Sequence, residues 1–106
     1  MKQTSRVTGM PILTEEEIEK RNRLSRTLYL IKAERWRQQA KWGKQEHQFP
    51  MWLCILMKEL GDVAKAHLDF TRNPPTRERQ KAVEDELVQV AAVAAAMLEC
   101  WVYGKA

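Results

Sequence analysis

Residues 87–98 read Leu-Val-Gln-Val-Ala-Ala-Val-Ala-Ala-Ala-Met-Leu, and Gln89 is the only polar residue among them. The run is rich in alanine and shows no strand-like alternation, so it predicts a helix. It is too short to span a bilayer, and a helix that is apolar on every side is buried on every side. A chain of 106 residues needs a second subunit to bury such a helix fully. We therefore expect an all-α helical bundle that is completed by oligomerisation.

Capping signals predict where the first helical segment begins and ends. Thr14 followed by Glu17 is a capping box, and Gly43 is a typical stop signal. The segment between them, to about Lys41, is either one long helix or two helices with a break at residues 25–30. Residues 1–13 precede the cap and predict a flexible N-terminal arm, which leaves 14–106 as a single domain.

Two further helices follow from proline and threonine signals. Pro50 suits the first turn of a helix that runs to about Phe70. The Asn-Pro-Pro sequence at 73–75 breaks the chain, and Thr76 caps a last helix that ends near Trp101. The expected bundle therefore has about four helices.

The overall composition fits a cytoplasmic protein without a membrane or nucleic-acid partner. The net charge of +4 is mild, and no recognised nucleic-acid-binding motif is present. The N-terminal residues lack the apolar segment of a secretory signal. Cys54 and Cys100 fall within apolar helix and do not suggest a disulfide framework.

Two polar pairs stand out within the apolar helices. Glu59 and Asp62 are three residues apart, as are Glu86 and Gln89, so each pair shares one helix face. If the two helices are neighbours, four oxygen ligands converge, and such ligands favour Mg²⁺ or Mn²⁺ over zinc. The more common reading of such spacing is a set of solvated acids paired with neighbouring cations. Gln89 favours the metal site, because a lone polar residue in a buried run needs a partner.

Three segments resemble the MazG-like all-α nucleoside triphosphate pyrophosphohydrolases of the phage and cassette type, relatives of the dimeric dUTPases. Residues 35–47, Arg-Trp-Arg-Gln-Gln-Ala-Lys-Trp-Gly-Lys-Gln-Glu-His, resemble the signature of the first helix and loop. Residues 56–66 contain Lys-Glu-Leu-Gly-Asp, which is similar to the E-E-x-x-E block. Residues 86–94 begin Glu-Leu-Val-Gln, which is similar to the E-x-x-D block. Each segment alone is weak, but their order is specific, and they span about two-thirds of the chain.

The resemblance implies Mg²⁺-dependent cleavage of a nucleoside triphosphate to the monophosphate and pyrophosphate, with nucleotide-pool house-cleaning as the usual role. It implies a homodimer or homotetramer. Glu59 and Glu86 become the catalytic acids, and the metal ligands become Glu59, Asp62, Glu86 and Gln89. Trp42 is expected to stack on the base. The remaining residues expected on the substrate side are Gln38, Lys41, Gln45, His47 and Lys58.

Two positions depart from the family pattern. Lys58 replaces the first glutamate of its block, where a lysine can contact phosphate. Gln89 replaces the usual aspartate, and a neutral amide is a weaker Mg²⁺ ligand than a carboxylate. A second hypothesis is therefore a weakly active or inactive helical module that binds a nucleotide or a protein partner.

Overall fold

The structure is a computed structural model that describes residues 4, 9 and 12–106. It contains three helices, α1 (Glu15–Trp42), α2 (Phe49–Arg72) and α3 (Arg77–Tyr103), and the described residues form no β-strand. The all-α prediction is therefore confirmed. Most of the predicted N-terminal arm, residues 1–13, lies outside the described residues.

The described residues form three helices instead of about four, because α1 is continuous. The break considered at residues 25–30 is absent from this helix of 28 residues. The segment contains neither glycine nor proline. Its one β-branched polar residue, Thr27, donates a hydrogen bond from Oγ1 to the Arg23 carbonyl at 2.9 Å, so its hydroxyl is satisfied within the helix.

The helix ends lie where the sequence signals predicted them, within two residues. Thr14 Oγ1 accepts a hydrogen bond from the Glu17 amide, and Thr76 Oγ1 accepts one from the Arg79 amide. Gly43 and Gly104 follow α1 and α3 with φ of 72° and 78°, a backbone conformation that favours glycine. Pro50 lies in the first turn of α2.

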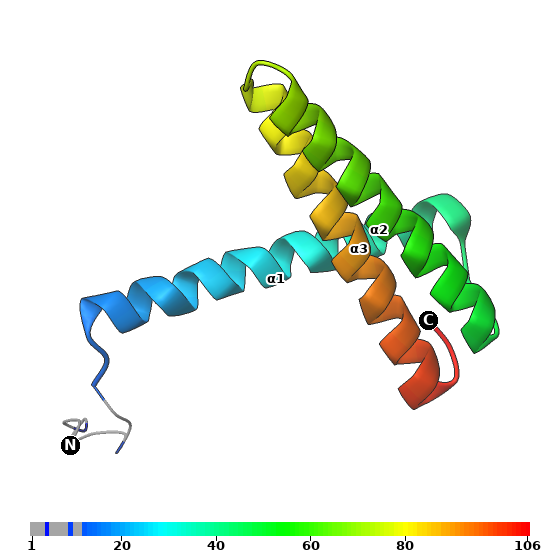
Figure 1. Ribbon diagram of the computed structural model, residues 1–106. Coiled ribbons are helices and arrows are strands. Elements are labelled where there is room, and N and C mark those ends of the chain that lie inside the picture. The colour runs from blue at the N-terminus through cyan, green and yellow to red at the C-terminus, as the bar shows by residue number, and fades with distance from the viewer. Residues whose placement is uncertain (1–3, 5–8, 10–11) are drawn as a thin grey trace.

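Helix α3 is the element that the other two contact (Figure 1). It returns along α2 as a helical hairpin, and α1 crosses it near its middle. No Cα atom of α1 lies within 8 Å of one in α2. The salt bridge between Arg35 and Glu99, at 2.6 Å, ties α1 to α3.

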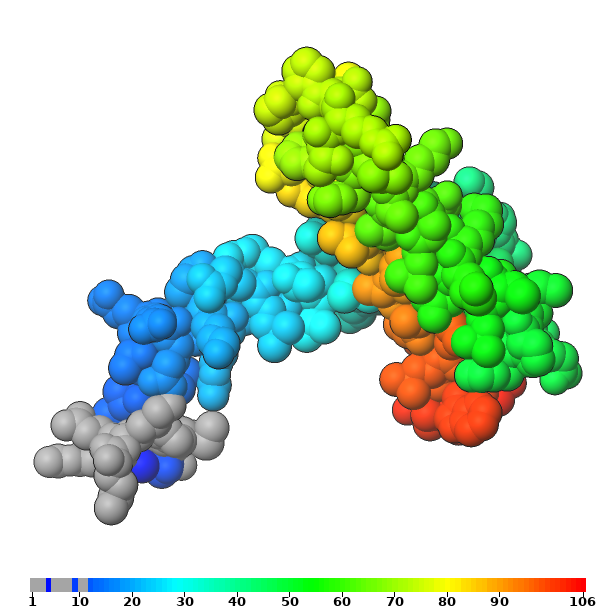
Figure 2. All heavy atoms as spheres, viewed as in Figure 1, coloured from blue at the N-terminus to red at the C-terminus, as the bar shows by residue number. Residues whose placement is uncertain are grey.

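Few of the apolar side chains that the structure describes are buried. Trp52, Val93 and Ala96 form the buried cluster, where α2 packs on α3. Leu24 and Leu28 on α1 stay 58% and 55% exposed, and Figure 2 shows this half of α1 standing clear of the α2–α3 pair. The radius of gyration is 18.4 Å, whereas a compact chain of about 100 residues has about 13 Å. The chain on its own thus leaves long apolar helix faces uncovered.

By length and composition alone, α3 could cross a membrane, because an 18-residue stretch within it has a mean hydropathy of 1.4. The prediction from residues 87–98 considered that run alone, whereas the stretch in α3 is longer. The central helix of a bundle can have the same length and apolar composition as a membrane-spanning helix. In this structure α3 contacts both other helices.

Candidate metal centre

Three carboxylates converge where α2 faces α3. Glu59 and Asp62 lie one turn apart on α2, and Glu86 approaches them from α3. One oxygen of each carboxylate lies within 4.8 Å of the others, and all three residues are partly buried. Helical spacing places Glu59 and Asp62 on one face of α2. The antiparallel pairing of α2 with α3 brings Glu86 to the same face.

Two of these carboxylates carry a buried oxygen without a hydrogen-bond donor. They are Glu59 Oε2 and Glu86 Oε2, and the described residues supply a partner to neither. A buried acceptor without a partner costs free energy, and the cost is larger for a charged group. A divalent cation satisfies such oxygens directly, and carboxylates are the ligands that Mg²⁺ and Mn²⁺ prefer. The three carboxylates therefore fit a site for Mg²⁺ or Mn²⁺.

The pKa of Glu86 is raised above its ordinary value of 4.5. Burial is the largest cause, followed by the negative charges of Asp62 and Glu59, and Lys58 acts in the opposite direction. Burial and the two neighbouring carboxylates thus both disfavour the ionised form of Glu86. A group in this state gains from a bound cation.

The raised pKa predicts how Glu86→Gln changes stability in metal-free protein. The ionised Glu86 is disfavoured in the folded state, so the variant should be more stable than wild type at neutral pH. As the pH falls through the folded pKa of Glu86, the wild type takes up a proton and this advantage should fade, disappearing below the ordinary value of 4.5. Urea unfolding in EDTA at several pH values measures the difference. An advantage that grows toward acid pH would contradict this assignment.

Lys58 lies at the outer side of the three acids. Its ammonium is 3.3 Å from Asp62 Oδ2, and its side chain is 73% exposed. The hydrogen bond and charge of Asp62 raise its pKa, with smaller contributions from Glu59 and Glu86. The residue expected on the substrate side therefore also pairs with a predicted metal ligand.

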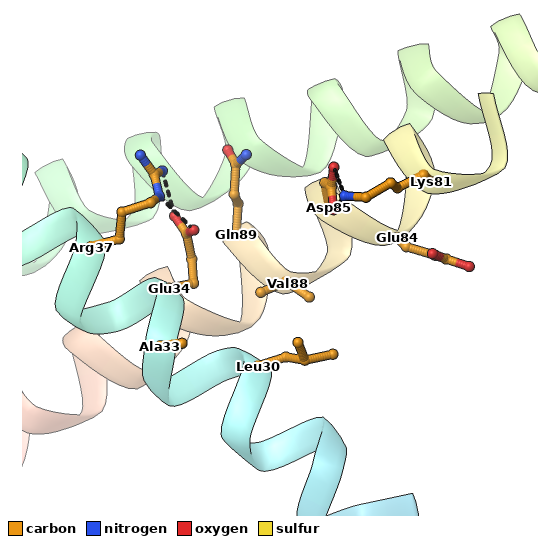
Figure 3. A pocket seen from close by; sticks show the side chains of 9 residues that line it. All are labelled: Leu30, Ala33, Glu34, Arg37, Lys81, Glu84, Asp85, Val88 and Gln89. Atoms are coloured by element: carbon orange, nitrogen blue, oxygen red, sulfur yellow. Dashed lines mark hydrogen bonds and ion pairs between the residues drawn. The ribbon is translucent and has the colours of Figure 1, made fainter. Parts of the chain in front are cut away.

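Gln89 lines a groove between α1 and α3, one turn after Glu86 (Figure 3). The groove has a volume of about 660 Å³. Gln89 stands between two ion pairs, Arg37 with Glu34 and Lys81 with Asp85, and none of the described residues hydrogen-bonds to its amide. Its position as a fourth metal ligand stays a prediction.

A cavity of about 200 Å³ joins the end of α1 to the acidic centre. Three of the residues expected on the substrate side line it, together with one predicted metal ligand; its full lining is Gln38, Trp42, Gln45, Ile55, Glu59 and Val93. The structure thus places an aromatic ring and two amides in the same cavity as a carboxylate of the centre.

Gln38 forms a hydrogen bond with Glu34, a residue that was not among the predicted site residues. Among the described residues Gln38 is the only buried polar one, and its Nε2 donates a hydrogen bond to Glu34 Oε2 at 3.1 Å. Arg37 in turn donates two hydrogen bonds to Glu34, at 2.7 and 2.6 Å. Glu34 and Gln38 are four residues apart, and this spacing alone makes two residues neighbours on a helix surface. Glu34 therefore fixes which way the Gln38 amide points.

Besides Lys58, two more residues expected on the substrate side, His47 and Lys41, lie outside this cavity. His47 packs edge-on against Trp52, with ring centroids 4.8 Å apart, so it contributes to the core. The Lys41 ammonium lies 5.3 Å from the centroid of the Trp42 ring and is exposed. Their roles in substrate binding stay predictions.

Comparisons with protein-family models, with curated proteins and with solved structures found no match to this chain.

Proposed function

We propose that this protein is a metal-dependent nucleoside triphosphate pyrophosphohydrolase with a MazG-like fold. Its main support is the convergence of Glu59, Asp62 and Glu86. Two of these carboxylates have a buried oxygen without a hydrogen-bond donor among the described residues. The cavity lined by Trp42 and two glutamines shares Glu59 with this centre. A site for a base therefore adjoins a site for a metal and phosphates.

Glu59, Asp62 and Glu86 hold the metal in this proposal, with Gln89 as a neutral fourth ligand. Mg²⁺, when bound, supplies positive charge to the phosphate groups of the substrate. Beyond the acids, a second opening of about 440 Å³ is lined by Asp62, Lys65, Ala66, Asp69 and Glu86. It offers room for a phosphate chain that runs away from the base.

The cavity beside Glu59 is proposed to take the base. The face of Trp42 offers a stacking surface, and its side chain is 48% exposed, so a ligand can reach it. The amides of Gln38 and Gln45 both donate and accept hydrogen bonds, which suits the edge of a base. Glu34 orients the Gln38 amide through the hydrogen bond described above.

A panel of nucleoside and deoxynucleoside triphosphates, incubated with the protein and Mg²⁺ or Mn²⁺, tests the proposal. We expect at least one to yield pyrophosphate and the monophosphate. Release of orthophosphate alone, or no release from any nucleotide at high protein concentration, would exclude this activity.

The second candidate is a module of the same fold that binds a nucleotide without cleaving it. Gln89 favours it, because it leaves the centre with three carboxylates. Calorimetry with Mg²⁺ and a deoxynucleoside triphosphate would then detect binding without turnover. In this case the variant Gln89→Asp should bind Mg²⁺ more tightly, and unchanged affinity would show that residue 89 is not a ligand.

We propose that a second copy of the chain covers the apolar faces, in a homodimer or homotetramer in the cytoplasm. The stripe of α1 that carries Arg35, which pairs with Glu99 of α3, and the buried Gln38 continues into the projecting half through Leu24 and Leu28. Most helical stability in proteins comes from packing of an apolar face, so the exposed leucines of the projecting half favour a partner surface there.

Light scattering should therefore give a mass of at least twice 12.4 kDa. The double variant Leu24→Lys and Leu28→Lys should shift the protein toward monomer, since it places two charges on the stripe. Arg21→Ala with Arg23→Ala is the matched control on the same part of α1 and should leave the mass unchanged. A monomeric wild type at concentrations of about 100 µM would contradict the assembly.

A further inference from the structure

Lys58 is the only cationic residue in the described chain that forms an ion pair with the acidic centre. Its Nζ lies 3.3 Å from Asp62 Oδ2, whereas Glu59 and Glu86 have no such partner there. The other lysines and arginines of α2 and α3 with ion pairs bind acids outside the centre, such as Lys81 with Asp85.

The centre has two sides that differ in burial. The orphaned oxygens Glu59 Oε2 and Glu86 Oε2 are buried. The Lys58–Asp62 pair is at the outer side, with the lysine side chain 73% exposed. A cation at the buried oxygens is therefore compatible with the ion pair, whereas a second cation at Asp62 would compete with the ammonium.

The charges of the centre also favour one divalent cation over two. With all three carboxylates ionised, as metal binding requires, the centre carries three negative charges, and Lys58 offsets one of them. The remainder equals the charge of one divalent cation. A second divalent cation would leave a net positive charge in a partly buried site, which is unfavourable.

We propose that Lys58 is a tethered counter-ion that limits the acidic centre to a single divalent cation. The inference rests on the proposed function, because it requires that the centre binds metal. It goes further by assigning Lys58 to the control of metal stoichiometry. Its exposed ammonium is also free to leave Asp62 for a phosphate group of the substrate, since an exposed ion pair is weak.

A calorimetric titration with Mn²⁺ alone, without any nucleotide, tests this inference. Wild type should bind one ion per chain. Lys58→Glu adds a ligand in place of the counter-ion and should bind two. Lys58→Gln should still bind one ion, roughly tenfold more tightly, because a positive charge close to the metal has been removed. This second variant serves as the test if Lys58→Glu does not fold, as judged by circular dichroism.

Lys81→Glu is the matched control, since Lys81 forms the same type of pair with Asp85 at 2.9 Å on α3. It should bind Mn²⁺ as wild type does. Two ions in the wild type, or the same stoichiometry and affinity in wild type and both Lys58 variants, would overturn the role of Lys58 and leave the metal centre standing. A wild type that binds no Mn²⁺ would instead overturn the metal centre itself.

Discussion

Glu59→Gln should lower pyrophosphate release by about 100-fold or more, since a metal-held phosphate gains several kcal/mol and each 1.36 kcal/mol is tenfold in rate. Glu59 combines two features of the centre. One of its oxygens is buried without a donor, and its side chain also lines the cavity with Trp42. The substitution keeps the shape of the side chain and removes the charge. Steady-state assays at saturating Mg²⁺, with Mn²⁺ binding measured in parallel, should show both losses together.

Glu84→Gln is the control for this experiment. Glu84 is an exposed acid on α3 that pairs with Arg77, away from the three carboxylates. Its variant should keep the activity and the Mn²⁺ affinity of wild type. Circular dichroism should show the same helicity for both variants. Wild-type turnover in Glu59→Gln would mean that the acidic cluster is not the active centre.

Trp52→Ala should cost about 3–5 kcal/mol of unfolding free energy, the usual loss for a buried large aromatic side chain. Trp52 is 2% exposed and is the largest member of the buried cluster, and it also contacts the His47 ring. A small domain has only about 5–15 kcal/mol in total, so the variant should be close to unfolding at room temperature. Urea denaturation followed by circular dichroism measures the change.

Trp36→Ala is the matched substitution on α1, where the tryptophan is 60% exposed. It should cost less than about 1 kcal/mol, as is usual for surface positions. Equal losses in the two variants would show that the main stabilising contacts lie in an interface that also includes Trp36, instead of in the cluster around Trp52.

Local signals in the sequence predicted the helix ends well. Thr14, Thr76 and Gly43 act through hydrogen bonds or backbone conformations within a few residues, so neighbours in the sequence determine them. Of the two alternatives for the first segment, the structure has the single continuous helix, for a related local reason. No glycine or proline stands at 25–30, and Thr27 satisfies its own hydroxyl within the helix.

The candidate site was only partly accessible from the sequence. Helical spacing places Glu59 beside Asp62, but the approach of Glu86 depends on how α3 packs along α2. The packing of His47 on Trp52 and the hydrogen bond from Gln38 to Glu34 are also tertiary outcomes. The run at 87–98 shows how incomplete burial can be in one chain, because Leu87 and Leu98 stay 53% and 63% exposed although the run predicted full burial.

In the proposed function, Glu59, Asp62 and Glu86 together hold a divalent cation. Anomalous diffraction from crystals of the protein soaked in Mn²⁺ tests it most directly. We expect one anomalous peak per chain, within coordinating distance of an oxygen from each of the three carboxylates. No peak at these carboxylates, with Mn²⁺ bound elsewhere or not at all, would contradict it.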